Sequence, residues 1–458
     1  MRLIARYAKQ RATDFEIITV WDQKTEIEQV SLQQPSIKTL SKTHPSALWF
    51  ERKMHDDFGI IIEDAFDNRP LVQQERFPDK IHPMLKSFQQ SELKEAPFKP
   101  YKYETIRGDG VFEVSVGPIH AGIIEPGHFH FSQAGEDILH QEVRHFYKYR
   151  GIEKMLEGKS LSQAKAIISR ISGNESIAYH LAWRDIQLQA SGNELAQNSQ
   201  KYHAMLLEME RIAHHLTDLG FIPNDAGFSA ALAFCSKLAE DTRRQLKQLC
   251  GHRFGFDAVD FEAHTLDLEG FDSFLDSLEK EMAFFESWIL NIPSLLDRFD
   301  TTGILKNFQA LKYDVVGVMA RASGVATDRR DTPFYQKHGF SIETQDKGDV
   351  GARFKLRINE VKQSIALIRK LKVSQVDKVT FAEAKDAKDG DYCAYTESSI
   401  GELFMAIELK NGLISRFYVR DPSFINWQAL HLMMPGNIIA DFPLINKSCD
   451  LSYAGNDL

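Results

Sequence analysis

Residues 209–228 read MERIAHHLTDLGFIPNDAGF and contain a regular row of polar side chains. Glu210, His214 and Asp218 recur every four residues, and this spacing places them on one face of a helix. Asp225 follows in a turn-rich segment. Carboxylate and imidazole groups in such a row can bind a metal ion or handle protons. The structural alternative, which is the commoner one, is a polar stripe that packs against a neighbouring element or interface.

The sequence around this row predicts a helical centre. Apolar residues recur with helical spacing in seven segments, several of them long enough for a bundle. These segments are residues 136–157, 160–170, 176–190, 194–219, 225–249, 271–291 and 351–371. Residues 104–132 are predicted to form strands, and residues 401–421 a hairpin whose turn is Asn411–Gly412. The predicted fold class is therefore α+β, with a β-rich start before the bundle.

The first 97 residues are predicted to form a small α/β unit. Residues 16–21 have strand character, and residues 47–63 predict a helix that ends near Gly59 and a short strand after it. A polar, proline-containing stretch then marks a boundary near residue 98, which gives two domains, 1–97 and 98–458. In the helix, Trp49 and Phe58 are candidate docking anchors for a partner.

Composition excludes several classes of protein. The 458 residues carry a formal net charge of −9 and no long basic run, which argues against nucleic acid as a partner. No stretch is apolar enough to span a membrane, and the polar N-terminal residues argue against a secretory signal, so we expect a cytoplasmic location. The four cysteines form no CxxC pair, so we expect buried thiols without disulfides and no metal site built from them.

Two further groups of residues could carry chemistry. His120 and Glu125 lie in GPIHAGIIEPGHFHF (117–131), where a histidine beside Gly and Pro turns could act as a ligand or proton donor. The alternative is that the histidines of this segment simply face outward from a strand and have no chemical role. Arg321 lies in a small, apolar segment, and Asp349 is in GDVGAR (348–353). A buried arginine requires a partner, so a structural ion pair is the favoured interpretation there.

Several motifs resemble one family of respiratory subunits. WFERKMHDDFGI (49–60) resembles a motif of the complex I 30 kDa subunit. Five further segments resemble the large subunit of energy-converting nickel–iron hydrogenases and the related complex I 49 kDa subunit. They are GPIHAGIIEPGHFHFSQAGEDILHQEVRHFYKYRGIEK (117–154), residues 209–228, GHRF (251–254), ARASG (320–324) and GDVGAR. The resemblance covers roughly residues 45–90 and 104–458. It implies an iron–sulfur small subunit and a complex I-like membrane subunit as partners, on the cytoplasmic face of the inner membrane.

The resemblance also assigns four residues to the nickel-binding cysteines of those hydrogenases. The first CxxC pair falls at Ser172 and Glu175, and the second at Ser452 and Gly455. None of the four is a cysteine, so we expect no nickel–iron or iron–sulfur centre on this chain, with iron–sulfur clusters on partner subunits instead. The same assignment implies that the two pairs meet in space, about 280 residues apart in sequence. We expect Arg321 beside them, paired with Glu175.

Two hypotheses follow for the remnant cavity. In complex I the corresponding cavity binds a quinone, but only His120 matches the quinone-contacting residues, since Ile124 and Gly173 occupy the other positions. One hypothesis is a redox-coupling subunit whose cavity binds a quinone or another small molecule, or relays protons through His120, Glu125, Glu175, Arg321 and Asp349. The other is a non-catalytic scaffold that docks an iron–sulfur subunit to a membrane subunit. An open polar pocket favours the first hypothesis and a packed one the second.

Overall fold

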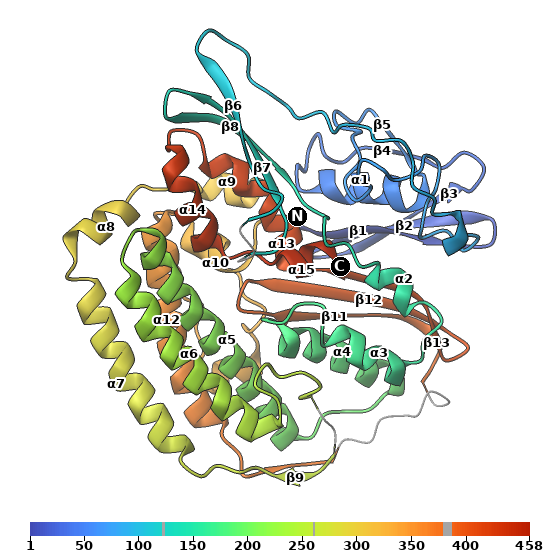
Figure 1. Cartoon of the computed structure of the whole chain (residues 1–458). Coiled ribbons are helices and arrows are strands. Elements are labelled where there is room, and N and C mark those ends of the chain that lie inside the picture. Colours follow the sequence, from blue (N-terminus) through green and yellow to red (C-terminus); the bar gives the residue numbers. More distant parts are fainter. Residues whose placement is uncertain (121–123, 260–261, 379–386) are drawn as a thin grey trace.

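The computed structural model describes residues 1–120, 124–259, 262–378 and 387–458 (Figure 1). Its N-terminal unit combines sheets and one helix. Three antiparallel strands, β1 (Leu3–Gln10), β2 (Asp14–Trp21) and β3 (Thr25–Ser31), form a meander. Two short parallel strands, β4 (Ser36–Lys38) and β5 (Ile61–Glu63), flank helix α1 (Ala47–Phe58). Gly59 ends this helix in the left-handed conformation that glycine adopts without strain. The predicted helix and strand of this segment are therefore confirmed.

A second antiparallel sheet follows the first unit. It contains β6 (Val111–Val116), β7 (His128–Ala134) and β8 (Asp137–Arg144), in that order. The predicted helix over residues 136–157 is wrong for most of its length, because residues 137–144 pair with β7 as a strand. Only α2 (Ile152–Leu156) is helical there. Ile138, Gln141 and Arg144 are buried, a spacing of three that fits a helix as well as this bulged strand.

The central bundle consists of four long helices that lie side by side on one side of the molecule (Figure 1). They are α5 (Gln197–Asp225), α6 (Ser229–Cys250), α7 (Phe271–Ile289) and α12 (Val350–Leu371). Helix α5 packs against both α6 and α12 and is buried along most of its length. Helix α4 (Ser176–Ser191) lies outside the bundle. The remaining helices are short: α3 (Leu161–Ile168), α8 (Pro293–Phe299), α9 (Asn307–Lys312), α10 (Gly317–Ala322), α11 (Pro333–Lys337), α13 (Pro422–Asn426), α14 (Phe442–Cys449) and α15 (Tyr453–Asp457). The predicted α+β fold with a central bundle is confirmed.

A third sheet lies between α4 and the N-terminal unit (Figure 1). Its strands are β11 (Gly390–Glu397), β12 (Glu402–Lys410) and β13 (Leu413–Arg420). Asn411 and Gly412 both have positive φ, so the predicted type I′ hairpin turn is confirmed. Helix α4 covers β11 and β12, and β13 contacts β1, where Tyr7 and Tyr418 stack at 4.2 Å between ring centroids. This sheet therefore links the N-terminal unit to helix α4.

The fold buries the two aromatic residues that we expected to contact a partner, Trp49 at the junction of the N-terminal unit with the rest and Phe58 in the core of that unit. Trp49 packs against Phe146 and Phe424, and Phe58 packs against Phe15. Both Trp49 and Phe58 are buried, so their role is in the core of this chain and the docking prediction is wrong for them. Large aromatic residues in a helix do not by themselves indicate a docking surface, because such side chains are equally suited to an interface and to a core.

Two other predictions concern membrane-spanning segments and the cysteines. Among the described residues, no helix is both long enough and apolar enough to cross a bilayer. All four cysteines are free thiols, as expected. Cys235 and Cys449 are buried, Cys250 is half-buried and Cys393 is exposed, so the expectation of four buried thiols holds only for the first two and is wrong for Cys393.

Candidate functional site

The two turns that the resemblance assigns to nickel ligands lie against each other. Ser172 and Glu175 occupy the turn before α4, and Ser452 is the N-cap of α15. The Ser172 and Ser452 hydroxyl oxygens are 3.2 Å apart. Ser172 Oγ also donates to Glu175 Oε2 at 3.1 Å, and Ser452 Oγ accepts from the Gly455 amide at 2.9 Å. The four positions therefore meet at one place, 280 residues apart in sequence, as the resemblance predicts.

A carboxylate occupies the space that a side chain at position 455 would need. A Cβ atom built on Gly455 would lie 2.1 Å from Asp421 Oδ2. The same Asp421 oxygen accepts a hydrogen bond from the Tyr179 hydroxyl at 2.6 Å. Ser172, Glu175, Gly455, Tyr179 and Asp421 are all buried. The position that the resemblance assigns to nickel is therefore filled by oxygen atoms of this chain, and we call these five residues with Ser452 the oxygen cluster.

In the part of the chain that the structure describes, the carboxyl groups of the oxygen cluster have no lysine or arginine partner. Among the described residues, neither Glu175 nor Asp421 forms an ion pair with a lysine or arginine, and Glu175 Oε1 accepts no hydrogen bond. Burial, and then the charge of Asp421, raise the pKa of Glu175 well above its ordinary value. Burial likewise raises the pKa of Asp421. A buried carboxyl without a counter-ion keeps its proton, so this cluster can hold at least one proton at neutral pH.

Glu210, the first residue of the polar row, has a structural role. It accepts hydrogen bonds from the Ile177 and Ala178 amides at 2.7 and 3.1 Å. These amides belong to the first turn of α4, whose N–H groups have no partner within the helix. Burial raises the pKa of Glu210 to about 8. The side chain therefore caps a neighbouring helix and fixes the turn that contains Glu175.

Arg321 does not pair with Glu175, so that prediction is wrong. Its guanidinium contacts Glu360 Oε1 at 2.8 Å, Glu397 Oε1 at 2.7 Å and Asp328 Oδ2 at 3.2 Å. Three carboxylates from distant parts of the chain neutralise this buried arginine, which leaves Glu175 without it. The structural ion pair, the alternative for Arg321, is the correct interpretation.

Asp349 and Glu125 also lie outside the oxygen cluster. Asp349 is the N-cap of α12, where its carboxylate accepts from the Ala352 amide at 2.7 Å and the Thr301 amide at 3.0 Å. It holds the end of a helix, so its cavity role is wrong. Glu125 forms a partly exposed ion pair with Lys148. Neither residue belongs to the pair of buried carboxyl groups formed by Glu175 and Asp421.

A cavity of about 280 Å³ lies beside the oxygen cluster. Two predicted residues line it: His120, whose Nε2 donates to the Gly127 carbonyl at 2.6 Å, and Asp225 at the end of α5. Its other lining residues include Phe129, Phe442, Lys447, Asp450 and Tyr453. Asp450, Leu451 and Tyr453 line the cavity while Ser452 contacts Ser172, so one short segment separates the cavity from the oxygen cluster.

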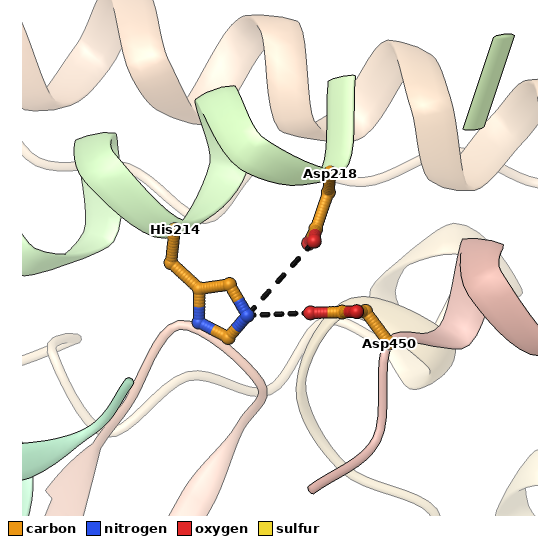
Figure 2. A group of neighbouring side chains, drawn as sticks. All are labelled: His214, Asp218 and Asp450. Carbon is orange, nitrogen blue, oxygen red and sulfur yellow. Dashed lines mark hydrogen bonds and ion pairs between the residues drawn. The ribbon is translucent and has the colours of Figure 1, made fainter. Parts of the chain in front are cut away.

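The remaining members of the polar row meet an aspartate that sequence reasoning missed. His214 Nε2 lies 2.5 Å from Asp450 Oδ2 and 3.9 Å from Asp218 Oδ1 (Figure 2). Burial lowers the pKa of His214, but Asp218 and Asp450 outweigh this effect and raise it. Burial and the neighbouring Asp450 raise the pKa of Asp218 to about 7. Asp450 stands two residues before Ser452, and this nearness to an assigned ligand position is the signal that could have identified it.

Comparison with known proteins agrees with this architecture. A family model described as the 49 kDa subunit of respiratory-chain NADH dehydrogenase matches residues 225–388 and 372–457, and one described as the 30 kDa subunit matches residues 6–94. Formate hydrogenlyase subunit 5 of Escherichia coli K12 is 27% identical, over 94% of this chain and 78% of its own length. An NADH-quinone oxidoreductase subunit of Akkermansia muciniphila is 26% identical, over 74% of this chain and 90% of its own.

A solved structure extends the comparison to the fold. A chain of the membrane-bound sulfane sulfur reductase, an archaeal respiratory membrane complex, has the same fold, with a TM-score of 0.69 at 21% identity. The likeness covers 76% of this chain and 99% of that one. The family model of the 49 kDa type alone spans more than half of the sequence, and the 30 kDa type accounts for most of the N-terminal unit. This chain therefore belongs to the family of the 49 kDa subunit of respiratory-chain NADH dehydrogenase, with a segment of the 30 kDa subunit type at its N-terminus.

Proposed function

We propose that this chain is a peripheral-arm subunit of a membrane-associated respiratory oxidoreductase complex, in which buried carboxyl groups at the former nickel position hold and pass protons. It binds an iron–sulfur small subunit and a complex I-like membrane subunit on the cytoplasmic face of the membrane. The iron–sulfur clusters belong to the partner, and this chain has neither a cluster nor a nickel–iron centre. The observation that carries the proposal is the burial of Glu175 and Asp421 without a lysine or arginine partner among the described residues.

The chemistry of the oxygen cluster supports the loss of nickel. Thiolates suit a soft, redox-active metal, whereas hydroxyl and carboxyl oxygens suit harder ions or protons. The four positions offer two serine hydroxyls, one carboxyl group and a glycine, with no sulfur atom. Asp421 fills the space at Gly455, so the geometry leaves no room there for a cysteine side chain.

The hydrogen bonds of the cluster support proton transfer. The Ser172 hydroxyl joins Glu175 Oε2 to Ser452 Oγ, and the Tyr179 hydroxyl bonds to Asp421. A hydroxyl both donates and accepts, so it can pass a proton between the groups on either side. The segment that contains Ser452 also lines the 280 Å³ cavity through Tyr453. Protons held by the carboxyl groups therefore lie close to a cavity.

The cavity supports binding of a small redox-active molecule such as a quinone headgroup. Its walls combine the aromatic rings of Phe129 and Phe442 with the polar groups of His120 and Asp225. Apolar walls with a few polar groups are typical of small-molecule sites. In this proposal the molecule binds in the cavity, and the packed oxygen cluster supplies protons to it.

The test compares complexes purified from membranes of the native host through a tag on this chain. We expect both partner subunits to co-purify, with far less than one nickel per chain after dialysis against a chelator. In a complex with Glu175→Gln we expect the same subunits but slower reduction of a short-chain quinone by reduced viologen, because glutamine cannot release a proton. Glu194→Gln, at an exposed position, is the matched control and should leave the rate unchanged.

The scaffold alternative is favoured by one observation, which is the packing of the former metal position. If the Glu175→Gln complex assembles and turns over at the wild-type rate, the chain only docks its partners and the proton-transfer proposal fails. Stoichiometric nickel that survives dialysis would contradict both hypotheses.

A further inference from the structure

We propose that His214, Asp218 and Asp450 form a binding site for a divalent transition-metal ion, for which Zn²⁺ is the natural probe. The three side chains come from α5 and from the residue after α14, and they point toward one another in Figure 2. The expectation of no nickel–iron or iron–sulfur centre rested on missing thiolates, whereas this site uses one nitrogen and two oxygen donors. The proposal does not depend on the proton chemistry of Glu175.

Each of the three side chains has one atom held by an outer partner and one atom directed inward. Ser399 Oγ bonds to His214 Nδ1, and Arg357 Nε donates to Asp218 Oδ2 at 2.8 Å. Lys447 Nζ donates to Asp450 Oδ1 at 2.5 Å. The three inward atoms, His214 Nε2, Asp218 Oδ1 and Asp450 Oδ2, lie within 4.8 Å of one another. Such outer partners fix the orientation of ligand side chains in metal sites.

The spacing of the inward atoms suits a small ion after a modest adjustment. Zinc bonds to nitrogen and oxygen are about 2.0–2.2 Å long, which places neighbouring ligand atoms of a tetrahedral site about 3.3 Å apart. The observed separations from His214 Nε2 are 2.5 Å to Asp450 and 3.9 Å to Asp218, one shorter and one longer than this value. Three protein ligands leave a fourth position for water.

An unsatisfied oxygen atom points independently to a missing ligand. Asp218 is 2% exposed, and its Oδ1 atom accepts no hydrogen bond from any described residue. His214 Nε2 and Lys447 Nζ approach this atom only to 3.9 Å, and Arg357 Nε donates to the other oxygen, Oδ2. Buried carboxylate oxygens are nearly always bonded, and an ion between Asp218 and His214 would satisfy this one.

The surrounding charges determine how an ion would bind. Asp218 and Asp450 face the positive charges of Arg357 and Lys447, so a metal must replace the proton on His214 Nε2 and compete with Lys447. Lys447 is the cation that can leave, because its side chain is 26% exposed and it lines the cavity, whereas Arg357 is buried. The cavity gives an ion a route to Asp450. The imidazole favours Zn²⁺ over Mg²⁺, which prefers oxygen ligands alone.

Zinc titration of the purified full-length chain tests the site, with bound metal measured by elemental analysis after gel filtration. We expect one Zn²⁺ per chain, no retained Mg²⁺, and weaker binding at acidic pH because protons compete for His214. Asp218→Asn should weaken binding at least about tenfold, and Lys447→Met should strengthen it by removing the competing charge. Asp241→Asn, on the surface of α6, should change nothing.

X-ray absorption at the zinc edge identifies the ligands directly. We expect nitrogen and oxygen neighbours that include an imidazole, and no sulfur. Failure of the wild-type chain to retain zinc would overturn the proposal, as would a zinc–sulfur shell, which would place the ion on a cysteine. If Asp218→Asn fails to fold, Lys447→Met still decides, because unchanged or weaker binding in that variant contradicts the predicted competition.

Discussion

Two groups of buried carboxyls in this molecule differ in the presence of cations. At the junction of the N-terminal unit, Lys53 on α1 contacts Asp57 and Glu153, and Arg416 on β13 contacts Glu153 at 2.7 Å. Two positive groups thus face two negative ones, all of them buried. In the oxygen cluster, Glu175 and Asp421 are equally buried but, among the described residues, accept hydrogen bonds from hydroxyls and a backbone amide and form no ion pair with a lysine or arginine.

The difference appears in the proton affinity of the two glutamates. Burial raises the pKa of Glu153, but Lys53 and Arg416 outweigh it, so the pKa lies below its ordinary value. The pKa of Glu175 is raised well above it, by burial and by Asp421. Equal burial therefore gives a charged group at the junction and a protonated one in the cluster. The partners determine which form is stable, and we expect mutations at the two sites to behave differently.

The largest effect is expected at the junction, from Glu153→Gln. This change leaves Lys53 and Arg416 facing Asp57 alone, with one uncompensated buried charge. Breaking a buried pair in this way costs about 3–5 kcal/mol of unfolding free energy. Urea unfolding measures the loss, with Glu157→Gln as a control that contacts Lys86 and Lys154 nearer the surface and should cost less than about 1 kcal/mol.

The second effect tests the packing of the oxygen cluster. In Gly455→Ala the new methyl group would meet Asp421 at 2.1 Å, so the carboxyl group must move away from Tyr179. Overpacking of this kind costs about 1–3 kcal/mol. The control is Gly173→Ala in the facing turn, where a Cβ would meet nothing within 4 Å. Equal stability of the two variants would show that Asp421 does not fill the space beside Gly455.

The third effect is a pH dependence that belongs to Glu175. The pKa of Glu175 is higher in the folded chain than in the unfolded chain. Protonation of Glu175 therefore stabilises the fold fully below the unfolded pKa of about 4.5, and this stabilisation is lost as pH rises toward the folded pKa. One such group changes the unfolding free energy by at most about 1.4 kcal/mol per pH unit. Wild type should therefore lose stability relative to Glu175→Gln when urea unfolding is repeated from about pH 6 to about pH 9. A difference that does not change with pH would mean that Glu175 is charged.

The smallest effect is that of Glu175→Gln itself near pH 4, where the glutamate of the unfolded chain is also largely protonated. Glutamine has the shape and charge of a protonated glutamate, and its oxygen can accept the bond from Ser172. We expect a change below about 1 kcal/mol, several times smaller than for Glu153→Gln. A loss as large as that of Glu153→Gln would remove the contrast between the two sites.

The parts of the structure that depend on local chemistry could be predicted from the sequence. The hairpin at Asn411–Gly412 follows from turn residues that tolerate positive φ, and α1 ends at Gly59 for the same reason. The strand over residues 137–144 was missed because its apolar spacing also fits a helix. Its pairing with β7 is a tertiary interaction that no local pattern specifies.

The candidate site was predictable only in part. The meeting of Ser172 with Ser452 came from resemblance, since 280 residues separate them. Asp421 was missed because 242 residues separate it from Tyr179, which lies four residues after Glu175 on α4. Arg321 was placed beside Glu175 on charge alone, but a buried arginine can choose among all carboxylates that the fold brings near it, and Glu360 and Glu397 lie closer.

The central claim is that a proton is held where the hydrogenases hold nickel, and infrared difference spectroscopy tests it most directly. Spectra of wild type and Glu175→Gln are compared at neutral pH in H₂O and D₂O. We expect the wild type to show the C=O stretching band of a protonated carboxyl group, shifted by deuterium and absent from Glu175→Gln. A difference spectrum with only the bands of an ionised carboxylate would contradict the account, because Glu175 would then be charged in its buried site.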